Sequence, residues 1–154
     1  MKNLVQIFCL MLLCVNTSCN GQSKANSEMD FEDEKFKVGQ IWQYETRKGE
    51  EESRVIILKV DKTENEIIVH VSVIKAKIKN PQKDGGVSNE IGHLPFSRES
   101  IEKSLTKLES SNNELPDFID GYNQWKEAFD SGQGGIFTIS VKEAVDYVEQ
   151  TMNQ

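Results

Sequence analysis

Residues that commonly build catalytic centres are scarce in this chain. Its 154 residues include two histidines and three cysteines. Cys9 and Cys14 lie within an apolar N-terminal run, so Cys19 is the only cysteine that follows this run. The part of the chain after the run therefore cannot form an internal disulfide or a zinc site built from paired cysteines.

Sequence motifs of common catalytic and nucleotide-binding sites are also missing. The sequence contains no G-x-S-x-G nucleophile elbow, no H-E-x-x-H helix motif and no phosphate-binding P-loop. We therefore expect neither a metal nor a cofactor.

Positive charge is in deficit. The chain has 18 lysines and arginines against 25 aspartates and glutamates, which gives a net charge of −7. Nucleic-acid binding requires clustered lysine and arginine, so we exclude nucleic acid as a partner. An acidic surface favours a basic partner or serves solubility alone, and both interpretations stay open.

Long hydrophobic runs are limited to the N-terminus. A short basic start, Met1-Lys2, leads into apolar residues from Leu4 to Val15 and then into small and polar residues before Cys19. This run is too short to span a bilayer, because a spanning helix needs roughly 20 apolar residues. The order of charged, apolar and small residues is typical of a secretory signal peptide.

The residues around Cys19 resemble a bacterial lipoprotein signal of the Bacteroidetes type. Thr17 and Ser18 supply the small residues before the cysteine, whereas Asn16 departs from the usual leucine. The resemblance implies removal of residues 1–18 and acylation of Cys19, for example with palmitate. An ordinary cleaved signal, with Cys19 as a spare thiol, is the alternative. Several acyl chains on one cysteine hold a protein stably on a membrane. We therefore expect a lipid-anchored protein of the cell envelope, at the inner or outer membrane and on its periplasmic or surface face.

The rest of the chain divides into a tether and one domain. Residues 19–35 are mostly polar and predict a flexible tether, and residues 36–154 predict a single domain. Three segments, 41–46, 53–60 and 67–78, alternate apolar with polar residues and are rich in β-branched side chains, as is typical of strands. Their short connections predict an antiparallel β-meander.

A helix is predicted after the meander. Residues 80–89 contain one proline and two glycines and read as a loop, and residues 91–96 as a short extended piece. Ser97 is then the expected N-cap of a helix that carries Leu105 and Leu108 on its apolar side.

Two further helices complete the pattern. The second begins near Pro116, and a brief strand at 136–139 follows it. Ser140 and Glu143 form a capping-box pattern for the last helix. Because strands come first and helices second, we predict an α+β fold. Its antiparallel meander has three strands plus one or two short ones, and about three helices pack on one face.

The two histidines are the only side chains whose ordinary pKa suits proton transfer near neutrality. His70 alternates with valines and is expected to be a half-exposed strand residue. His93 lies in the stretch Ile-Gly-His-Leu-Pro-Phe, which makes it the candidate functional loop residue. The alternative is a histidine bonded to backbone at a strand–helix junction.

A run of acidic residues near the first predicted hairpin is the candidate partner-binding site. It comprises Glu50, Glu51 and Glu52, with Arg54 beside them. Successive residues of an extended chain point to opposite sides, so these carboxylates do not converge on one metal ion. A solvated hairpin tip without a partner is the alternative.

Four aromatic residues follow one another at helical spacing in the second predicted helix: Phe118, Tyr122, Trp125 and Phe129. Such a stripe is typical of a helix face packed on a core. Lining of a ligand groove is the alternative.

The domain itself also resembles known proteins. The opening stretch Val-Gly-Gln-Ile-Trp-Gln-Tyr at 38–44, together with Gly-His-Leu-Pro-Phe-Ser at 92–97, is similar to a set of small uncharacterised bacterial envelope proteins. The resemblance implies a shared fold for residues 36–150 and no particular activity.

These observations favour a membrane-anchored binding or accessory module. A basic envelope protein is the expected partner, and one form of this hypothesis is an inhibitor or immunity factor against a basic toxin. The alternative is a small-ligand-binding protein or a hydrolase-like enzyme that uses His93 with a carboxylate such as Glu90 or Glu99.

Overall fold

The computed structural model describes residues 31–154. The signal and tether predictions for residues 1–30, including acylation of Cys19, lie outside this range. The described elements, in chain order, are β1 (Gln40–Tyr44), β2 (Arg54–Lys62), β3 (Ile67–Lys79), β4 (Val87–Ser97), α1 (Arg98–Ser104), β5 (Leu105–Ser111), α2 (Ile119–Asp130) and α3 (Val141–Met152). The predicted α+β class is confirmed. No helix within residues 31–154 is long and apolar enough to cross a membrane.

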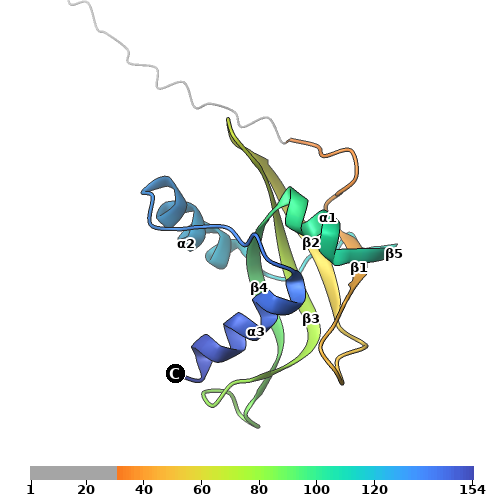
Figure 1. The fold of residues 1–154 in the computed structure, drawn as a ribbon, viewed down its shortest axis with the longest axis vertical. Helices are drawn as coiled ribbons and strands as arrows, with labels where there is room; N and C mark the ends of the chain where they lie inside the picture. The colour runs from red at the N-terminus through yellow and green to blue at the C-terminus, as the bar shows by residue number, and fades with distance from the viewer. Residues whose placement is uncertain (1–30) are drawn as a thin grey trace, which may run out of the picture.

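One antiparallel sheet organises the domain, with strand order β4-β3-β2-β1-β5 (Figure 1). The predicted three-strand meander is confirmed as β1, β2 and β3, and β4 continues it. The turn before β4 is closed by a backbone hydrogen bond of 2.9 Å from Asn80 to Gly86. Gly85 and Gly86 adopt positive φ angles of 84° and 70° there, which glycine does without steric cost.

The helix opened by Ser97 is shorter than its apolar spacing predicted. The Ser97 side chain does cap α1, but the helix ends at Ser104 and Leu105 begins β5. Strand β5 pairs with β1 at the edge of the sheet, where it satisfies the backbone groups of both strands. Periodicity within the segment could not show this, because the gain comes from β1, more than 60 residues earlier in the sequence.

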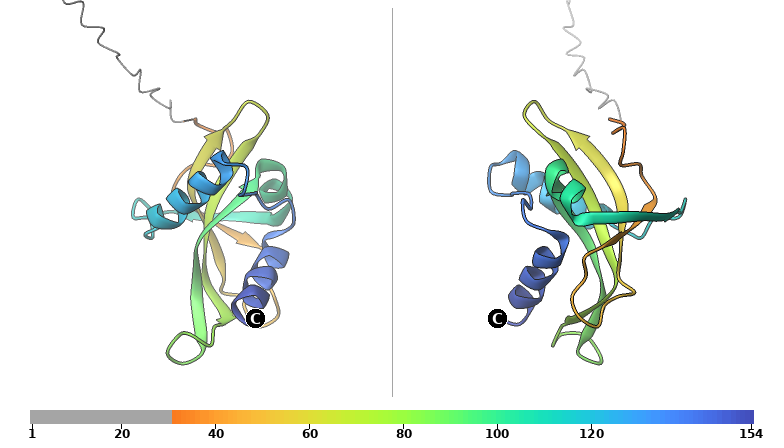
Figure 2. Two further views of the ribbon diagram at one scale, coloured as in Figure 1. Left: turned by 90° about the vertical axis from the view of Figure 1, so that its left-hand side faces the viewer. Right: turned by 45° about the vertical axis from the view of Figure 1, so that its right-hand side comes forward.

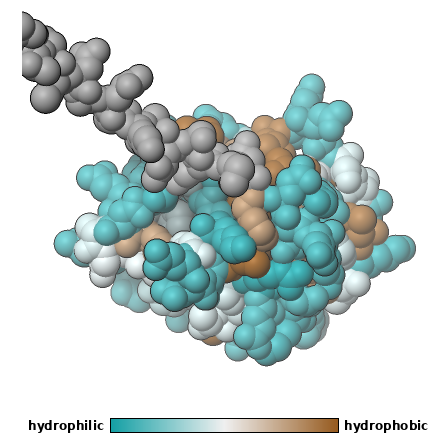
Figure 3. Space-filling model, turned by 90° about the horizontal axis from the view of Figure 1, so that it is seen from above, coloured by the Kyte–Doolittle hydropathy of each residue, from teal (hydrophilic) through white to brown (hydrophobic). Residues whose placement is uncertain are grey.

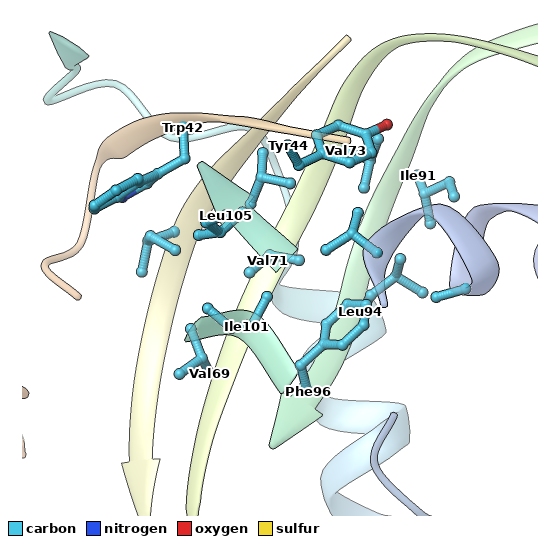
Figure 4. Packing of buried hydrophobic residues seen from close by; sticks show 14 of the residues in the cluster. Trp42, Tyr44, Val69, Val71, Val73, Ile91, Leu94, Phe96, Ile101 and Leu105 are labelled. Atoms are coloured by element: carbon cyan, nitrogen blue, oxygen red, sulfur yellow. The ribbon is translucent and has the colours of Figure 1, made fainter. Parts of the chain in front are cut away.

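The apolar core lies between one face of the sheet and helices α1 and α3 (Figure 4). Val69, Val71 and Val73 of β3 point into it, opposite Ile101 of α1 and Val145 of α3. Burying each such side chain contributes roughly 1.5–3 kcal/mol to folding. The sequence predicted about three helices on one face, but this face carries only α1 and α3, and α2 packs on the opposite face.

Helix α2 lies over the sheet separately from α1 and α3 (Figure 2). His70 alternates with Val69 and Val71 along β3, so it points to the opposite face, where it contacts the rings of Tyr122 and Trp125 in α2. The two faces of the sheet therefore have different coverings: aliphatic under α1 and α3, polar and aromatic under α2.

The segments at the two ends of the domain also differ in part from prediction. The brief strand at 136–139 is reduced to one parallel bridge between Phe96 and Phe137, whereas the Ser140–Glu143 capping box of α3 is confirmed. Asp33, in the stretch assigned to the tether, is 3% exposed. Its carboxylate accepts hydrogen bonds from the backbone of Phe36 and the side chain of Arg98. Contacts with the domain therefore begin before residue 36.

Candidate functional site

A buried polar cluster lies between the sheet and α2. His70 on β3 and His93 on β4 stack on each other, with 2.9 Å between His70 Nδ1 and His93 Nε2. Asp61 on β2 lies 3.2 Å from the other nitrogen of His70 through its Oδ2 atom. Tyr122 donates a hydrogen bond of 2.7 Å to the same Asp61 oxygen. Three adjacent strands and one helix thus place their polar side chains together.

Strand register explains how these residues meet. The ladder between β2 and β3 shifts between Ile57 and Lys59, so that Lys59 stands opposite His70 and Asp61 follows two residues later on the same side. A second shift, between β3 and β4, occurs next to His93. β-Bulges of this kind re-aim side chains locally and are frequent near functional sites.

Helix α2 approaches His93 closely because residue 121 is a glycine. A β-carbon placed at Gly121 would lie 3.1 Å from the β-carbon of His93. A larger residue would therefore push the helix away from the sheet, and with it the rings of Tyr122 and Trp125.

The arrangement determines where the imidazole protons lie. The ionised Asp61 carboxylate only accepts hydrogen bonds, so His70 Nε2 carries the proton facing it and His70 Nδ1 is the acceptor. His93 Nε2 therefore donates to His70, and His93 Nδ1 keeps a lone pair. His70 Nε2 is fully buried and makes no well-aligned hydrogen bond within the described residues, which leaves the 3.2 Å contact with Asp61 as a charge–dipole interaction.

Burial keeps both histidines neutral. Burial, followed by repulsion from His70, lowers the pKa of His93 from 6.5 to about 4. Burial also lowers the pKa of His70, although the neighbouring Asp61 opposes this shift. Burial alone would raise the pKa of Asp61, but its contacts with His70, Lys59 and Tyr122 prevail and hold the pKa far below the usual range. At neutral pH the cluster thus contains the Asp61 carboxylate, the Lys59 ammonium group paired with it and the two neutral imidazole rings.

A groove of about 740 Å³ opens beside the cluster, between α2 and the β2–β3 hairpin. The rings of Trp125 and Phe129 lie on the α2 side, with centroids 4.9 Å apart. Lys59 and Asp61 line the hairpin side, and Phe31 lies at the groove as well. Viewed from the hairpin end, the surface is mostly hydrophilic with smaller apolar areas between (Figure 3). The groove therefore offers aromatic contact area next to fixed charges.

The groove residues are held in place by specific contacts. Trp125 donates its indole N–H to the carbonyl of Gly135 over 2.8 Å. Lys59 is bonded to Asp61 and lies 5.2 Å from the centroid of the Tyr122 ring. Side chains immobilised before binding lose less conformational entropy when a ligand arrives.

The predicted acidic site is not uniformly accessible, and Glu50 is a correction. Its side chain is 3% exposed and accepts two hydrogen bonds from Arg47, of 2.8 and 2.6 Å, and one from the backbone of Lys77. A buried carboxylate needs such partners, so Glu50 holds the hairpin to β3 and is not available to a partner protein. Glu51 and Glu52 are exposed, as expected of a solvated tip.

Arg54, the fourth residue of that site, is engaged within the protein. Its guanidinium donates to both carboxylate oxygens of Glu109, at 2.7 and 3.1 Å. The structure therefore brings Arg54 together with β5 and not with the three glutamates.

The histidine predictions are corrected in two respects. His70 is not half-exposed but fully buried. Within residues 31–154, the His93 ring makes no hydrogen bond to backbone, and its partner is His70. The suggested carboxylate Glu99 pairs instead with Lys103, at 2.5 Å, on the surface of α1. The sequence did carry a signal for the histidine pair, because both histidines interrupt aliphatic strands and a stripe of four aromatic residues follows them. The strand register, which the sequence patterns do not give, was needed to show that the two histidines are in contact.

The aromatic stripe of α2 contacts this polar cluster and not the aliphatic core. None of the twelve residues of α2 is buried.

Among residues 31–154, no group of three or more histidine, cysteine, aspartate or glutamate side chains is arranged to hold a metal ion. Comparison with known proteins adds no relative: no family model, curated protein or solved structure matches the chain.

Proposed function

We propose that this chain is a lipid-anchored protein of the cell envelope whose domain binds another envelope protein through the groove between α2 and the β2–β3 hairpin. The observation that carries the proposal is the groove itself, with Trp125 and Phe129 facing a fixed Lys59–Asp61 pair. Ligand sites are typically concave and largely apolar, with a few well-placed polar groups. Trp and Tyr are also the residues most often responsible for binding energy at protein interfaces.

Charge supports a basic segment as the bound part of the partner. Glu32, Glu64 and Asp130 line the groove, in addition to the paired Asp61. Lys126 is bonded to Asp130, and Lys62 lies 5.2 Å from the centroid of the Phe31 ring. A partner segment with an apolar residue flanked by arginine or lysine would find aromatic faces and carboxylates together. The exposed Glu51 and Glu52 and the net charge of −7 would favour its approach over longer distances.

The envelope part of the proposal rests on the N-terminal sequence. If Cys19 is acylated, eleven residues lie between it and Phe31 at the groove, and an extended chain spans at most about 3.6 Å per residue. The groove would then lie within about 40 Å of the lipid anchor. We infer that the partner is itself at or near the membrane surface.

Catalysis by His93 is less well supported. The order Asp61–His70–His93 resembles a base held by an orienting carboxylate. In the described part of the chain, however, His93 hydrogen bonds to His70 and to no serine, threonine or cysteine side chain. His93 also does not line the groove. The cluster therefore supports the groove wall and is not proposed as a catalytic centre.

Purification of the tagged full-length protein from detergent-solubilised envelopes tests the proposal. Wild type is compared with Phe129→Asp, which places a charge in the groove, and with Val87→Asp, which places one at an exposed position of β4. We expect one stoichiometric partner with wild type and Val87→Asp, at least tenfold less with Phe129→Asp, and loss of the partner as salt rises. Equal recovery with both variants would place the binding site elsewhere.

A further inference from the structure

The attachment of α2 to the sheet depends on polar contacts to an unusual degree. With no buried residue of its own, α2 meets the sheet through Tyr122 and Trp125, whose rings stand 5.1 and 4.6 Å from the ring of His70. The same two rings lie 5.9 and 6.0 Å from His93. The hydrogen bond from Tyr122 to Asp61 and the contact of Lys59 with the Tyr122 ring, 5.2 Å from its centroid, add to these connections. Removing this cluster would take away all of these contacts between α2 and the sheet.

The cluster is complete only while both histidines are neutral. His93 donates to His70, and His70 faces Asp61 with its remaining N–H. A proton added to His70 Nδ1 would set two N–H groups against each other across 2.9 Å and break the bond between the rings. A proton added to His93 Nδ1 would place a cation next to Gly121 in the first turn of α2, where the helix dipole is positive.

Other charged groups around the pair act in both directions. From β2, Lys59 opposes proton uptake and Asp61 favours it. From α2, the Tyr122 hydroxyl is committed to Asp61 and is neutral. Because His70 is fully buried and His93 lies under the helix, removal from water outweighs the single nearby carboxylate.

We propose that the stacked pair His70–His93 is a proton-sensitive latch, which holds α2 on the sheet at neutral pH and releases it when the pair takes up a proton. Release removes the Trp125 and Phe129 wall of the groove and exposes both rings to water. The importance of the latch for partner binding rests on the proposed function, whereas the release of α2 does not.

The expected size of the effect follows from proton linkage. With a pKa of about 4 when α2 is docked and of 6.5 when it is free, His93 alone would favour release about 20-fold more at pH 5 than at pH 7. Proton uptake by His70 would add to this in the same direction, since burial lowers its pKa too.

Hydrogen–deuterium exchange of the full-length protein in detergent micelles tests the latch without any partner. After correction for the intrinsic pH dependence of exchange, we expect the amides of α2 to lose at least tenfold protection between pH 7.5 and pH 5. At pH 5 the amides of α3 and β3 should remain at least tenfold better protected than those of α2. In His93→Gln, which retains a donor toward His70 but does not titrate, the loss in α2 should be at least fivefold smaller. Glu127→Gln, a change at an exposed position of α2 outside the groove, should behave as wild type.

Two results would overturn the latch. One is unchanged protection of α2 at pH 5, and the other is equal protection of the α2, α3 and β3 amides at pH 5, which would mean that α2 exchanges only by global unfolding. If His93→Gln does not fold, the imidazole NMR signals of wild type decide the question. The chain holds only two histidines, and the latch requires their titration to move α2 amide signals and not those of α3. Because no partner is used, failure of the latch leaves the groove proposal intact, and failure of the groove leaves the latch intact.

Discussion

Neighbouring side chains of the same type have very different roles in this domain. Glu50 is buried against Arg47, while Glu51 beside it lies in solvent. Arg47 also contacts Asp146 and Glu149 of α3, at 3.2 and 3.3 Å. The Arg47–Glu50 pair therefore ties the β1–β2 connection to both β3 and α3.

This contrast gives a matched pair of substitutions. Glu50→Gln should lower the free energy of unfolding by about 2 kcal/mol or more, because it leaves a partly buried guanidinium without its main counter-charge. Glu51→Gln should leave the denaturation midpoint unchanged, since its amide oxygen can still accept from Gly49. Urea unfolding at pH 7.5 compares the two, and equal midpoints would show that Glu50 is not structural.

The sequence singled out His93 as a candidate but did not predict the surroundings of either histidine. His93 was recognised as a candidate, and its partner His70 was assigned to a half-exposed position. The two residues are 23 positions apart, and their contact depends on a register shift between β3 and β4. No pattern within either strand encodes that shift, so the pair could not be derived from the sequence.

Among the elements, those with local determinants were predicted best. The meander follows from period-two alternation and short turns, and α3 from its capping box. Strand β5 was missed because its stability comes from pairing with β1. Helix α2 was located correctly, but its aromatic stripe was assigned to the apolar core. Aromatic residues of a helix have the same sequence spacing whether they pack on histidines or on valines, so the spacing does not distinguish the two.

The junction between β1 and β5 depends on Gly39. This residue has a φ of +86°, and a β-carbon there would lie 2.2 Å from the carbonyl oxygen of Asn112. Gly39→Ala should therefore lower the free energy of unfolding by more than backbone strain alone would, and that strain is of order 1–3 kcal/mol. Gly49→Ala is the matched control, because Gly49 has a φ of +85° and no atom within 4 Å of its β-carbon position.

Thermal unfolding of the two variants distinguishes the contributions. We expect the midpoint of Gly39→Ala to fall several degrees below that of Gly49→Ala, with reduced protection of β5 amides. If the two midpoints coincide, the contact with Asn112 does not anchor β5.

For the whole molecule, stability should decrease on mild acidification. The pKa of His93 is lower in the folded chain than its unfolded value of 6.5, so the unfolded state binds more protons at lower pH. Its contribution is complete above pH 6.5 and is lost as the pH falls toward 4. The loss from His93 is at most about 3 kcal/mol.

Urea midpoints measured between pH 7.5 and pH 4.5 check this direction. Wild type should lose stability steadily below pH 6.5, and His93→Gln should show a shallower dependence. A midpoint that rises or stays constant over this range would contradict neutral, buried histidines.

The proposed membrane attachment depends on Cys19. Cys19→Ser should remove the acylation site and move the protein from the membrane fraction to the soluble fraction, and a labelled fatty acid should mark wild type and not Cys19→Ser. Ser18→Ala, which keeps a small residue before the cysteine, is the control. Persistent membrane attachment of Cys19→Ser would argue for an uncleaved signal or another anchor.

The most direct test of the central claim is photo-cross-linking of the full-length protein in intact cells. A photoreactive phenylalanine derivative replaces Phe129 in the groove or, as a control, Lys83 in the turn between β3 and β4. The account predicts one discrete adduct to a basic envelope protein from position 129 and none from position 83. An adduct from position 83 alone, or no adduct from either position, would contradict a binding module that uses this groove.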